Sequence, residues 1–256
     1  MDCTIHKCYN EWIKQPTLNN VMTPTIEAYT EAQIAYDTFN KELFNSELPE
    51  CLLTYQRQLN VMGYFSPERF SNFDGKKVDE IALNPAYFAA YPMIEIMQTI
   101  VHEMVHQWQY HFGTPSKRSY HNKEWSAKME GLGLMPSTTG QEGGKKVGEK
   151  MADYPIVGGK FLAVCERLFT EEFKFSWYDR LVNQKIIDSG NACFSIENNI
   201  LSSSSPNLSA AELVVLSPIP VATKNTRTKY SCPCGNNVWA KADLNLICGD
   251  CDERYE

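Results

Sequence analysis

An HExxH pattern, formed by His102, Glu103 and His106, lies inside an apolar stretch and constrains this chain more than any other feature. Residues 94–110 carry apolar side chains at steps of three and four, which predicts a helix with a broad buried stripe. Positions four apart share one face of a helix, so the two imidazoles project together and can hold one metal ion. The pattern therefore predicts a metal site with a carboxylate beside it.

The chemistry implied by this arrangement is peptide-bond hydrolysis. Zinc bound by such a pair lowers the pKa of a water molecule to about 7. Glu103 is placed to take a proton from that water and to return it to a leaving amine. The competing interpretation is a pair of ordinary core histidines. It is disfavoured because two buried imidazoles beside a buried carboxylate are costly without a metal ion.

A third ligand has to come from outside the HExxH pattern. The extended pattern HExxHxxGxxH requires Gly at position 109 and His at position 112, but the chain has Gln109 and Phe112 there. His111 lies about 180° around the helix from His102, so we expect it to be exposed, where it suits the C-terminal end of the helix dipole.

His121 is the better candidate for the third ligand. It follows a break that begins at Gly113, and the apolar residues within 122–131 predict a second helix that returns past the first. Glu124, one turn further on, is the alternative, and it would give a site of two His and one Glu. A third interpretation, His121 as an ordinary polar residue at the start of that helix, also remains.

Three segments carry a resemblance to a known family. They are residues 102–106 (HEMVH), 121–125 (HNKEW) and 129–134 (MEGLGL), with shorter similar segments upstream and downstream. Together they resemble the SprT-like metallopeptidases, to which the Spartan proteases of DNA–protein crosslinks belong, and they are most similar to the bacterial and phage members. The resemblance covers most of residues 24–180 and resumes near the C-terminus.

This resemblance implies an α+β fold with a zincin-like metallopeptidase core, in which helices pack on a small antiparallel sheet, and a C-terminal zinc ribbon. It implies that His102, His106 and His121 bind a catalytic zinc ion and that Glu103 is the catalytic residue. Zincins typically hold the substrate as an added strand along the sheet edge nearest the metal. Residues 78–84 are a candidate for that edge, and an ordinary half-buried strand is an equal alternative.

Two closely spaced pairs of cysteines near the C-terminus predict a structural zinc site. The four residues are Cys232, Cys234, Cys248 and Cys251. Four thiolates in a tetrahedral array describe a zinc ribbon, and so small a unit would fold on the free energy of metal binding. The first pair is C-x-C, one residue shorter than the C-P-x-C-G usual in SprT-like ribbons, which tightens the first knuckle.

The family resemblance and the spacing of the cysteines divide the chain into four segments. They are an N-terminal tail (1–23), the SprT-like metallopeptidase domain (24–180), a linker or insert (181–228) and the zinc ribbon (229–256). Within them we predict a loop over 136–148, a core-packed helix over 158–175, and a strand or linker end over 213–221. An apolar content of 43% is ample for one substantial core.

Hydropathy and cysteine usage favour a cytoplasmic protein. No N-terminal signal pattern and no apolar run long enough to span a bilayer is visible, so we expect a soluble chain that does not interact with a membrane. Three further cysteines stand singly among apolar neighbours and are predicted to be free buried thiols: Cys51, Cys165 and Cys193. Cys3, His6 and Cys8 match no metal spacing and are assigned to the tail.

Charge limits the expectation of a nucleic-acid partner. The chain carries a net charge of −7, whereas a nucleic-acid surface should be basic. Tyr230 and Trp239 in the ribbon are candidates for stacking on single-stranded bases, although Trp239 equally suits the ribbon core. The expected partners are a protein substrate and, by the family resemblance, single-stranded or damaged DNA. The protein itself is expected to be a monomer.

The predicted function is that of a zinc-dependent endopeptidase acting on DNA-associated or DNA-crosslinked proteins. Two alternatives remain. One is a nucleic-acid-binding zinc-ribbon adaptor whose HExxH centre is structural or inactive. The other is a zinc hydrolase of a non-peptide substrate. For the oxyanion, Tyr120 and the tyrosines of 87–91 are candidates only.

Overall fold

The computed structural model describes residues 22–117, 119–171, 173–189, 217–218 and 227–256. The predictions for Cys3, His6, Cys8 and Cys193, and for most of the 181–228 segment, fall outside these residues. The chain separates into two compact units, Met1–Ser217 and Pro218–Glu256. The predicted zinc ribbon lies in the second unit.

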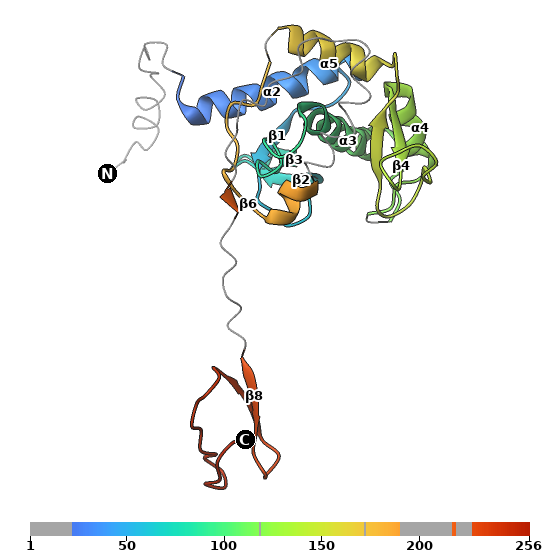
Figure 1. Ribbon diagram of the computed structural model, residues 1–256. Coiled ribbons are helices and arrows are strands. Elements are labelled where there is room, and N and C mark those ends of the chain that lie inside the picture. Colours follow the sequence, from blue (N-terminus) through green and yellow to red (C-terminus); the bar gives the residue numbers. More distant parts are fainter. Residues whose placement is uncertain (1–21, 118, 172, 190–216, 219–226) are drawn as a thin grey trace, which may run out of the picture. The chain divides into compact units, whose positions relative to one another are not determined.

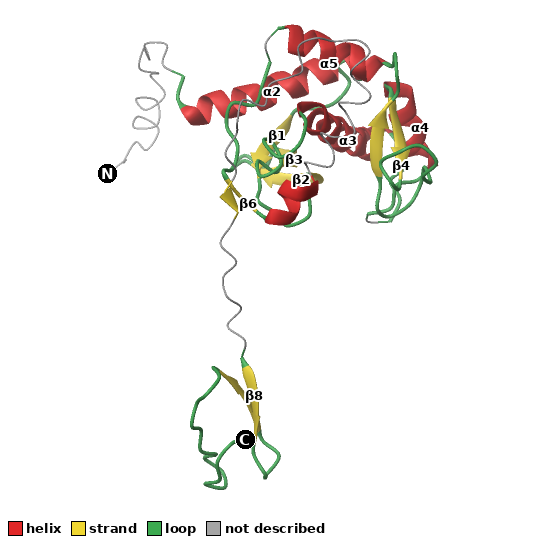
Figure 2. Cartoon of the chain, viewed as in Figure 1, coloured by secondary structure: helices red, strands yellow, loops and turns green. Residues whose placement is uncertain are grey.

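The described helices and strands are mixed along the chain, as in an α+β fold. In chain order they are α2 (Pro24–Leu43), β1 (Cys51–Tyr55), β2 (Gly63–Ser71), β3 (Lys77–Leu83), α3 (Met93–Phe112), α4 (Lys123–Leu132), β4 (Leu134–Ser137), β5 (Ala152–Pro155), α5 (Lys160–Thr170), β6 (Leu181–Val182), β7 (Ser217–Pro218), β8 (Thr228–Ser231) and β9 (Asn237–Ala240). Figure 2 shows that the helices α2, α3, α4 and α5 all lie in the larger unit. No helix in the described residues is both long and apolar enough to cross a membrane.

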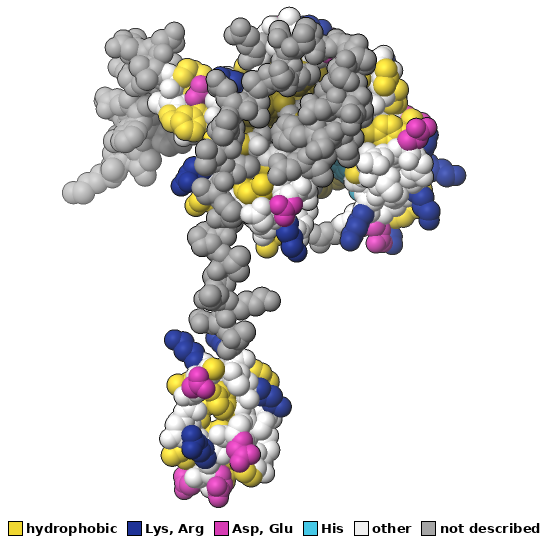
Figure 3. Space-filling model, viewed as in Figure 1, with side chains coloured by type: hydrophobic (Ala, Val, Ile, Leu, Met, Phe, Trp, Pro, Cys, Tyr) yellow, Lys and Arg dark blue, Asp and Glu magenta, His cyan; other side chains and the backbone are white. Residues whose placement is uncertain are grey.

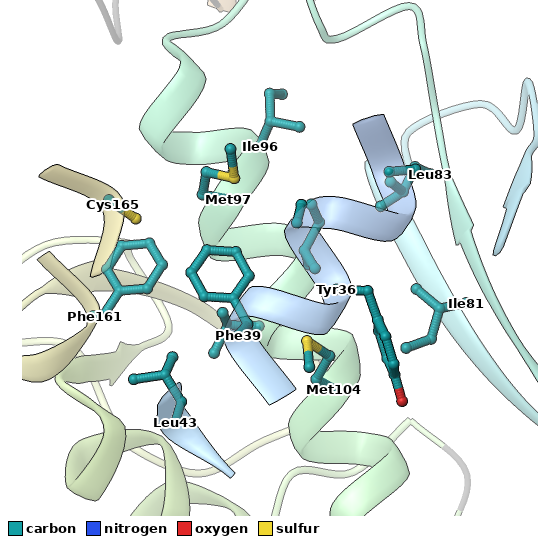
Figure 4. Close-up of a cluster of buried hydrophobic side chains, with 14 of the residues drawn as sticks. Tyr36, Phe39, Leu43, Ile81, Leu83, Ile96, Met97, Met104, Phe161 and Cys165 are labelled. Atoms are coloured by element: carbon teal, nitrogen blue, oxygen red, sulfur yellow. The ribbon is translucent and has the colours of Figure 1, made fainter. Parts of the chain in front are cut away.

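The core of the larger unit forms where α2, α3, α5 and the three-stranded sheet meet. Figure 4 shows Phe39 of α2 beside Phe161 of α5, and the two rings stack with their centroids 5.9 Å apart. Ile81 of β3 and Met104 of α3 belong to the same core and are fully buried. Residues on α2 and α3 reach this core at steps of three and four, so the helical period predicted for 94–110 is the one observed.

β3 is the central strand of a mixed sheet with the order β1-β3-β2. It pairs in parallel with β1 and antiparallel with β2, so the expected antiparallel sheet is found on one side only. The prediction that residues 78–84 form the edge nearest the metal site is therefore wrong. Residues 79–83 are buried on both faces, and alternation in the sequence does not reveal which neighbours a strand has.

The open edge next to α3 belongs to β2. Its register with β3 shifts between Ser66 and Phe70, and this irregularity contains Pro67 and the positive-φ residue Glu68 (φ 45°). Proline removes a backbone donor and is confined to edge strands and bulges. The buried carboxylate of Asp79 fixes the irregularity, because its Oδ1 accepts a hydrogen bond of 2.9 Å from the Glu68 N–H.

α3 lies between the three-stranded sheet and a second layer made of α4 and the β4–β5 hairpin (Figure 1). The predicted loop over 136–148 begins later than expected, because residues 136 and 137 belong to β4 and pair with β5. The predicted helix over 158–175 is shorter than expected and spans 160–170 as α5. Gly133 ends α4 in the left-handed conformation (φ 97°), which turns the chain directly into β4.

Candidate metal centre

Three imidazoles converge on one point in the larger unit. His102 and His106 project from the same face of α3, and His121 approaches from the residue pair that precedes α4. The Nε2 atom of His121 lies 3.2 Å from that of His102 and 3.0 Å from that of His106. Tetrahedral zinc with bonds of about 2.0–2.1 Å holds its nitrogen ligands about 3.3 Å apart. The two distances from His121 therefore suit a zinc ion, and the ligand atoms of all three histidines lie within 4.8 Å of one another.

In His102 and His121, the outer ring nitrogen, Nδ1, is hydrogen-bonded to the protein. The inner nitrogen, Nε2, which points at the shared centre, is therefore free to bind a metal. His102 Nδ1 lies 3.0 Å from the carboxylate Oδ2 of Asp153, and His121 Nδ1 lies 3.1 Å from the carbonyl oxygen of Gly148. Since only a protonated nitrogen can bond to these acceptors, each Nδ1 donates. In the neutral tautomer each Nε2 then carries a lone pair directed at the shared point. Lone pairs placed so close together repel unless a cation lies between them.

Burial keeps two of the three imidazoles neutral. Desolvation, with the nearby charge of His102, lowers the pKa of His106 to about 2 and that of His121 to about 4. Burial also acts to lower the pKa of His102, but the hydrogen bond to Asp153 and the charge of Glu103 outweigh it and raise that pKa. Neutral imidazoles are the form that binds metal, so near pH 7 His106 and His121 are ready ligands.

His121 owes its position to the end of α3. Asn122 caps α4, because its side chain accepts from the Trp125 N–H at 3.0 Å. The side chain of Gln109 on α3 donates to Asn122 Oδ1 at 2.8 Å and to Glu124 Oε2 at 2.7 Å. Gln109, which broke the extended HExxHxxGxxH pattern, thus ties the start of α4 to α3. His121 is held where those two helices meet.

Glu124, the alternative third ligand, has a different role. Its Oε2 also accepts from the backbone N–H of Thr114 at 2.7 Å, so the carboxylate bridges the α3–α4 turn. In the described part of the chain, the convergent histidine group consists of His102, His106 and His121 without Glu124. The geometry thus brings together the three residues that the family resemblance indicated.

Trp125 forms the wall behind the three imidazoles. It is fully buried, and its ring centroid lies 4.7, 5.5 and 4.4 Å from those of His102, His106 and His121, respectively. The indole therefore fixes the ring planes from one side and keeps water away from that side. Sequence reasoning placed Trp125 in a helix, but it did not predict this contact.

Glu103 lies between α3 and the open edge of β2. Burial raises the pKa of its carboxyl group, against the lowering effects of His102 and of a backbone hydrogen bond from Phe65. Gly63 permits β2 to approach α3 closely at this point. A Cβ atom at position 63 would lie 2.7 Å from Thr99 Cγ2 and 3.5 Å from Glu103 Cγ. A carboxylate next to a metal-binding group, with a pKa above its usual value, is suited to proton transfer.

His111, Tyr87, Tyr91 and Tyr120 make contacts with residues outside the histidine group. His111 is exposed, as expected from its place on the helix, but its Nε2 also bonds to Asp79 Oδ2 at 2.6 Å. Tyr87 and Tyr91 pack against each other, with ring centroids 5.3 Å apart. Tyr120 lies under the ammonium group of Lys117. Neither of these two ring contacts involves the histidine group.

The second convergent group is the cysteine cluster of the ribbon. The Sγ atoms of Cys232, Cys234, Cys248 and Cys251 lie within 4.8 Å of one another, and the four residues are free cysteines. Neighbouring sulfurs are 3.2–3.6 Å apart, close to the roughly 3.8 Å of a tetrahedral zinc–thiolate site. A hydrogen bond from the backbone of Asp250 lowers the pKa of the Cys248 thiol to about 6, which favours the thiolate. The C-x-C spacing thus still lets all four thiols converge.

Asp153, Gly148 and Gln109 are the site residues that sequence reasoning missed. All three act through contacts with the histidines or with the start of α4, and no spacing pattern links them to HExxH. Only Gln109 gave a signal in the sequence, because it is a polar residue on the apolar face of a predicted helix. Such a residue is buried and needs a hydrogen-bond partner.

Comparison with known proteins agrees with the geometry. The profile of the SprT-like family matches residues 32–142, which include the three histidines and Glu103. An "uncharacterized protein in mucB 3' region" of Salmonella typhimurium is 52% identical over 62 residues, which are 24% of this chain and 84% of that protein. No solved structure matches significantly. The chain belongs to the SprT-like family.

Proposed function

We propose that this protein is a zinc-dependent endopeptidase. The observation that carries the proposal is the convergence of three Nε2 atoms beside a buried glutamate at an open sheet edge. Membership of the SprT-like family supports a metallopeptidase-like function. Zinc held by His102, His106 and His121 would polarise the scissile carbonyl and make water reactive near neutral pH.

Glu103 would serve as the general base and then as the general acid. Its burial raises its pKa, which favours the uptake of a proton from water and the later transfer of that proton to a leaving amine. The Phe65 N–H that bonds to Glu103 holds this carboxylate at the strand edge. Asp153 and Gly148 hold the imidazoles of His102 and His121 in the orientation that presents Nε2.

The substrate would bind as an extended strand along β2. Tyr64 pairs with Ala82, and the Asn84 N–H donates to the Met62 carbonyl. The backbone N–H and C=O groups of the even-numbered residues of β2 therefore point toward β3. The backbone groups of Gly63 and Phe65 must then face outward, next to Glu103. An open edge in this position favours a peptide over a small-molecule substrate.

We further propose that the ribbon binds single-stranded DNA. Lys229 and Trp239 lie opposite each other in the β8–β9 hairpin. Arg227 directly precedes β8 and Lys241 directly follows β9, each two positions from one of this pair. Trp239 is 59% exposed, whereas Tyr230 on the other face is buried. An exposed indole flanked by three cations suits one stacked base and its neighbouring phosphates.

The substitution Glu103→Gln tests the peptidase proposal. In the zinc-loaded full chain, we expect casein digestion, assayed with and without a single-stranded oligonucleotide, to fall by about 10²–10⁴-fold. Glu80→Gln is the matched control, because Glu80 is also buried but its carboxylate accepts a hydrogen bond from Thr54 and belongs to no histidine group. Equal digestion by the wild type and Glu103→Gln would refute the proposal. A wild type that holds both zinc ions, binds DNA and digests nothing would favour the adaptor.

A further inference from the structure

Asp153 is the one carboxylate among the described residues whose oxygen lies within hydrogen-bonding distance of a site imidazole. It lies on β5, past residue 142, where the match to the family profile ends. Its side chain is only 6% exposed, and its Oδ2 lies 3.0 Å from His102 Nδ1. A buried carboxylate in this position meets the imidazole on the side away from the convergent nitrogens.

The carboxylate of Asp153 is itself fixed from α3. Gln98, one helical turn before His102, donates from Nε2 to Asp153 Oδ1 at 3.3 Å and to the Asp153 carbonyl at 3.2 Å. One oxygen is thereby tied to Gln98 and the other is directed at His102. Since Gln98 and His102 are on the same helix face, the bridge Gln98–Asp153–His102 sets both the position and the tilt of the carboxylate.

The stretch of chain that leads into β5 also hydrogen-bonds to a second imidazole, that of His121. The Gly148 carbonyl accepts from both the backbone N–H and the Nδ1 of His121, at 2.8 and 3.1 Å, and the Gly148 N–H returns a bond to the His121 carbonyl. Residues 148–153 therefore hold two of the three imidazoles by their outer nitrogens. Only one of these contacts, that of Asp153, brings a charge.

We propose that Asp153 is a positioning residue that sets the tautomer and ring orientation of His102 and thereby raises the affinity of the site for zinc. A carboxylate bonded to the outer nitrogen of an imidazole ligand makes the inner nitrogen a stronger donor. This inference rests on the proposed zinc site. It assigns to β5 a part in metal binding that the HExxH pattern does not contain.

The test is the zinc affinity of the full chain, measured by competition with a chromophoric chelator at constant pH. We expect Asp153→Ala to bind zinc at the histidine site about 10–100-fold more weakly than the wild type. Asp153→Asn keeps the shape and one acceptor but not the charge, so its affinity should lie between the two. The ion of the ribbon should stay bound at wild-type affinity in both variants and serves as an internal reference.

Asp79→Asn is the matched control. Asp79 is also buried and also bonds to a histidine, His111, but it lies outside the convergent group, so zinc affinity should not change. Cobalt in place of zinc adds a second readout, because a tilted His102 should alter the visible spectrum of the Asp153 variants and not that of Asp79→Asn.

The outcomes separate this inference from the proposed function. If wild-type protein binds zinc only in its ribbon, the proposed function fails. If wild-type protein binds both ions and Asp153→Ala binds them equally tightly with an unchanged cobalt spectrum, the role of Asp153 is refuted and the zinc site stands. Should the alanine variant not fold, Asp153→Asn decides, and wild-type affinity and spectrum in that variant refute the role.

Discussion

At the scale of single residues, Trp125 shows how packing prepares a polar site. It is fully buried and touches all three imidazoles, yet its Nε1 has no hydrogen-bond partner among the described residues. Its contribution must therefore come from the area and shape of the ring and not from its N–H group. An unpaired buried N–H is itself unfavourable by about 1–3 kcal/mol.

Substitution of Trp125 tests this view. Trp125→Ala should lower the free energy of unfolding by about 3–5 kcal/mol, because it leaves a large cavity against the histidines. Trp125→Phe should cost clearly less, since it keeps an aromatic wall and removes the unpaired N–H. Urea denaturation with a chelator present measures both losses without a contribution from metal binding. An equal loss in the two variants would mean that the area and shape of the aromatic ring are not what Trp125 contributes.

Prediction from the sequence worked best where chemistry and periodicity agreed. His102, Glu103 and His106 lie on one helix face because their spacing dictates it, and that could be read directly. The choice of His121 needed the family resemblance. Asp153 could not be found in advance, since it lies 51 positions from His102 and approaches it through a strand pairing.

At the scale of elements, the contact between α3 and β2 decides whether Glu103 can reach the sheet edge. Gly63 is the point of closest approach, and a Cβ atom there would meet Thr99 Cγ2 at 2.7 Å and the Ala82 carbonyl at 3.0 Å. The sequence predicted the helix and a strand over residues 78–84, but not which strand forms the edge of the sheet. Pro67 was the signal of an edge strand, because proline is excluded from the interior of a sheet.

Gly63→Ala should lower the free energy of unfolding by about 1–3 kcal/mol through overpacking. Thr99→Ser removes the clashing methyl group, so the double variant should recover part of that loss, and only part, because the Ala82 carbonyl remains close. Urea denaturation of the two single variants and the double variant measures the coupling.

Gly131→Ala is the control for this cycle. Gly131 lies in α4 with nothing within 4 Å of an added Cβ, so the substitution should stabilise the protein by up to about 1 kcal/mol. Additive effects of Gly63→Ala and Thr99→Ser would show that β2 does not press against α3 at this point.

At the scale of the whole molecule, two units carry different chemistries. The larger one holds the histidine group and the smaller one holds the cysteine cluster. A net charge of −7 argues against a broad nucleic-acid surface, and Figure 3 shows basic and acidic side chains interspersed on the visible side of the ribbon. The case for DNA therefore depends on the placement of a few cations around Trp239 and not on total charge.

Trp239→Ala tests that placement. We expect the affinity of the full chain for a single-stranded oligonucleotide to fall by about 5–150-fold, because one stacked base contributes about 1–3 kcal/mol. Lys229→Ala should instead reduce the slope of log affinity against log salt concentration by about 0.7, the loss of one phosphate contact. Fluorescence anisotropy over a range of salt concentrations measures both quantities.

Ile247→Ala is the matched control for these variants, because Ile247 is a similarly exposed apolar residue of the ribbon that lies outside the β8–β9 hairpin. It should bind DNA as the wild type does. All three variants should retain two zinc ions per chain, since none of these side chains is a ligand candidate. If Trp239→Ala and Ile247→Ala bind DNA equally well, the exposed indole is not a stacking platform. Any contact with DNA then has to involve a surface outside the hairpin face, while the peptidase proposal, which depends on Glu103 and the histidines, is unaffected.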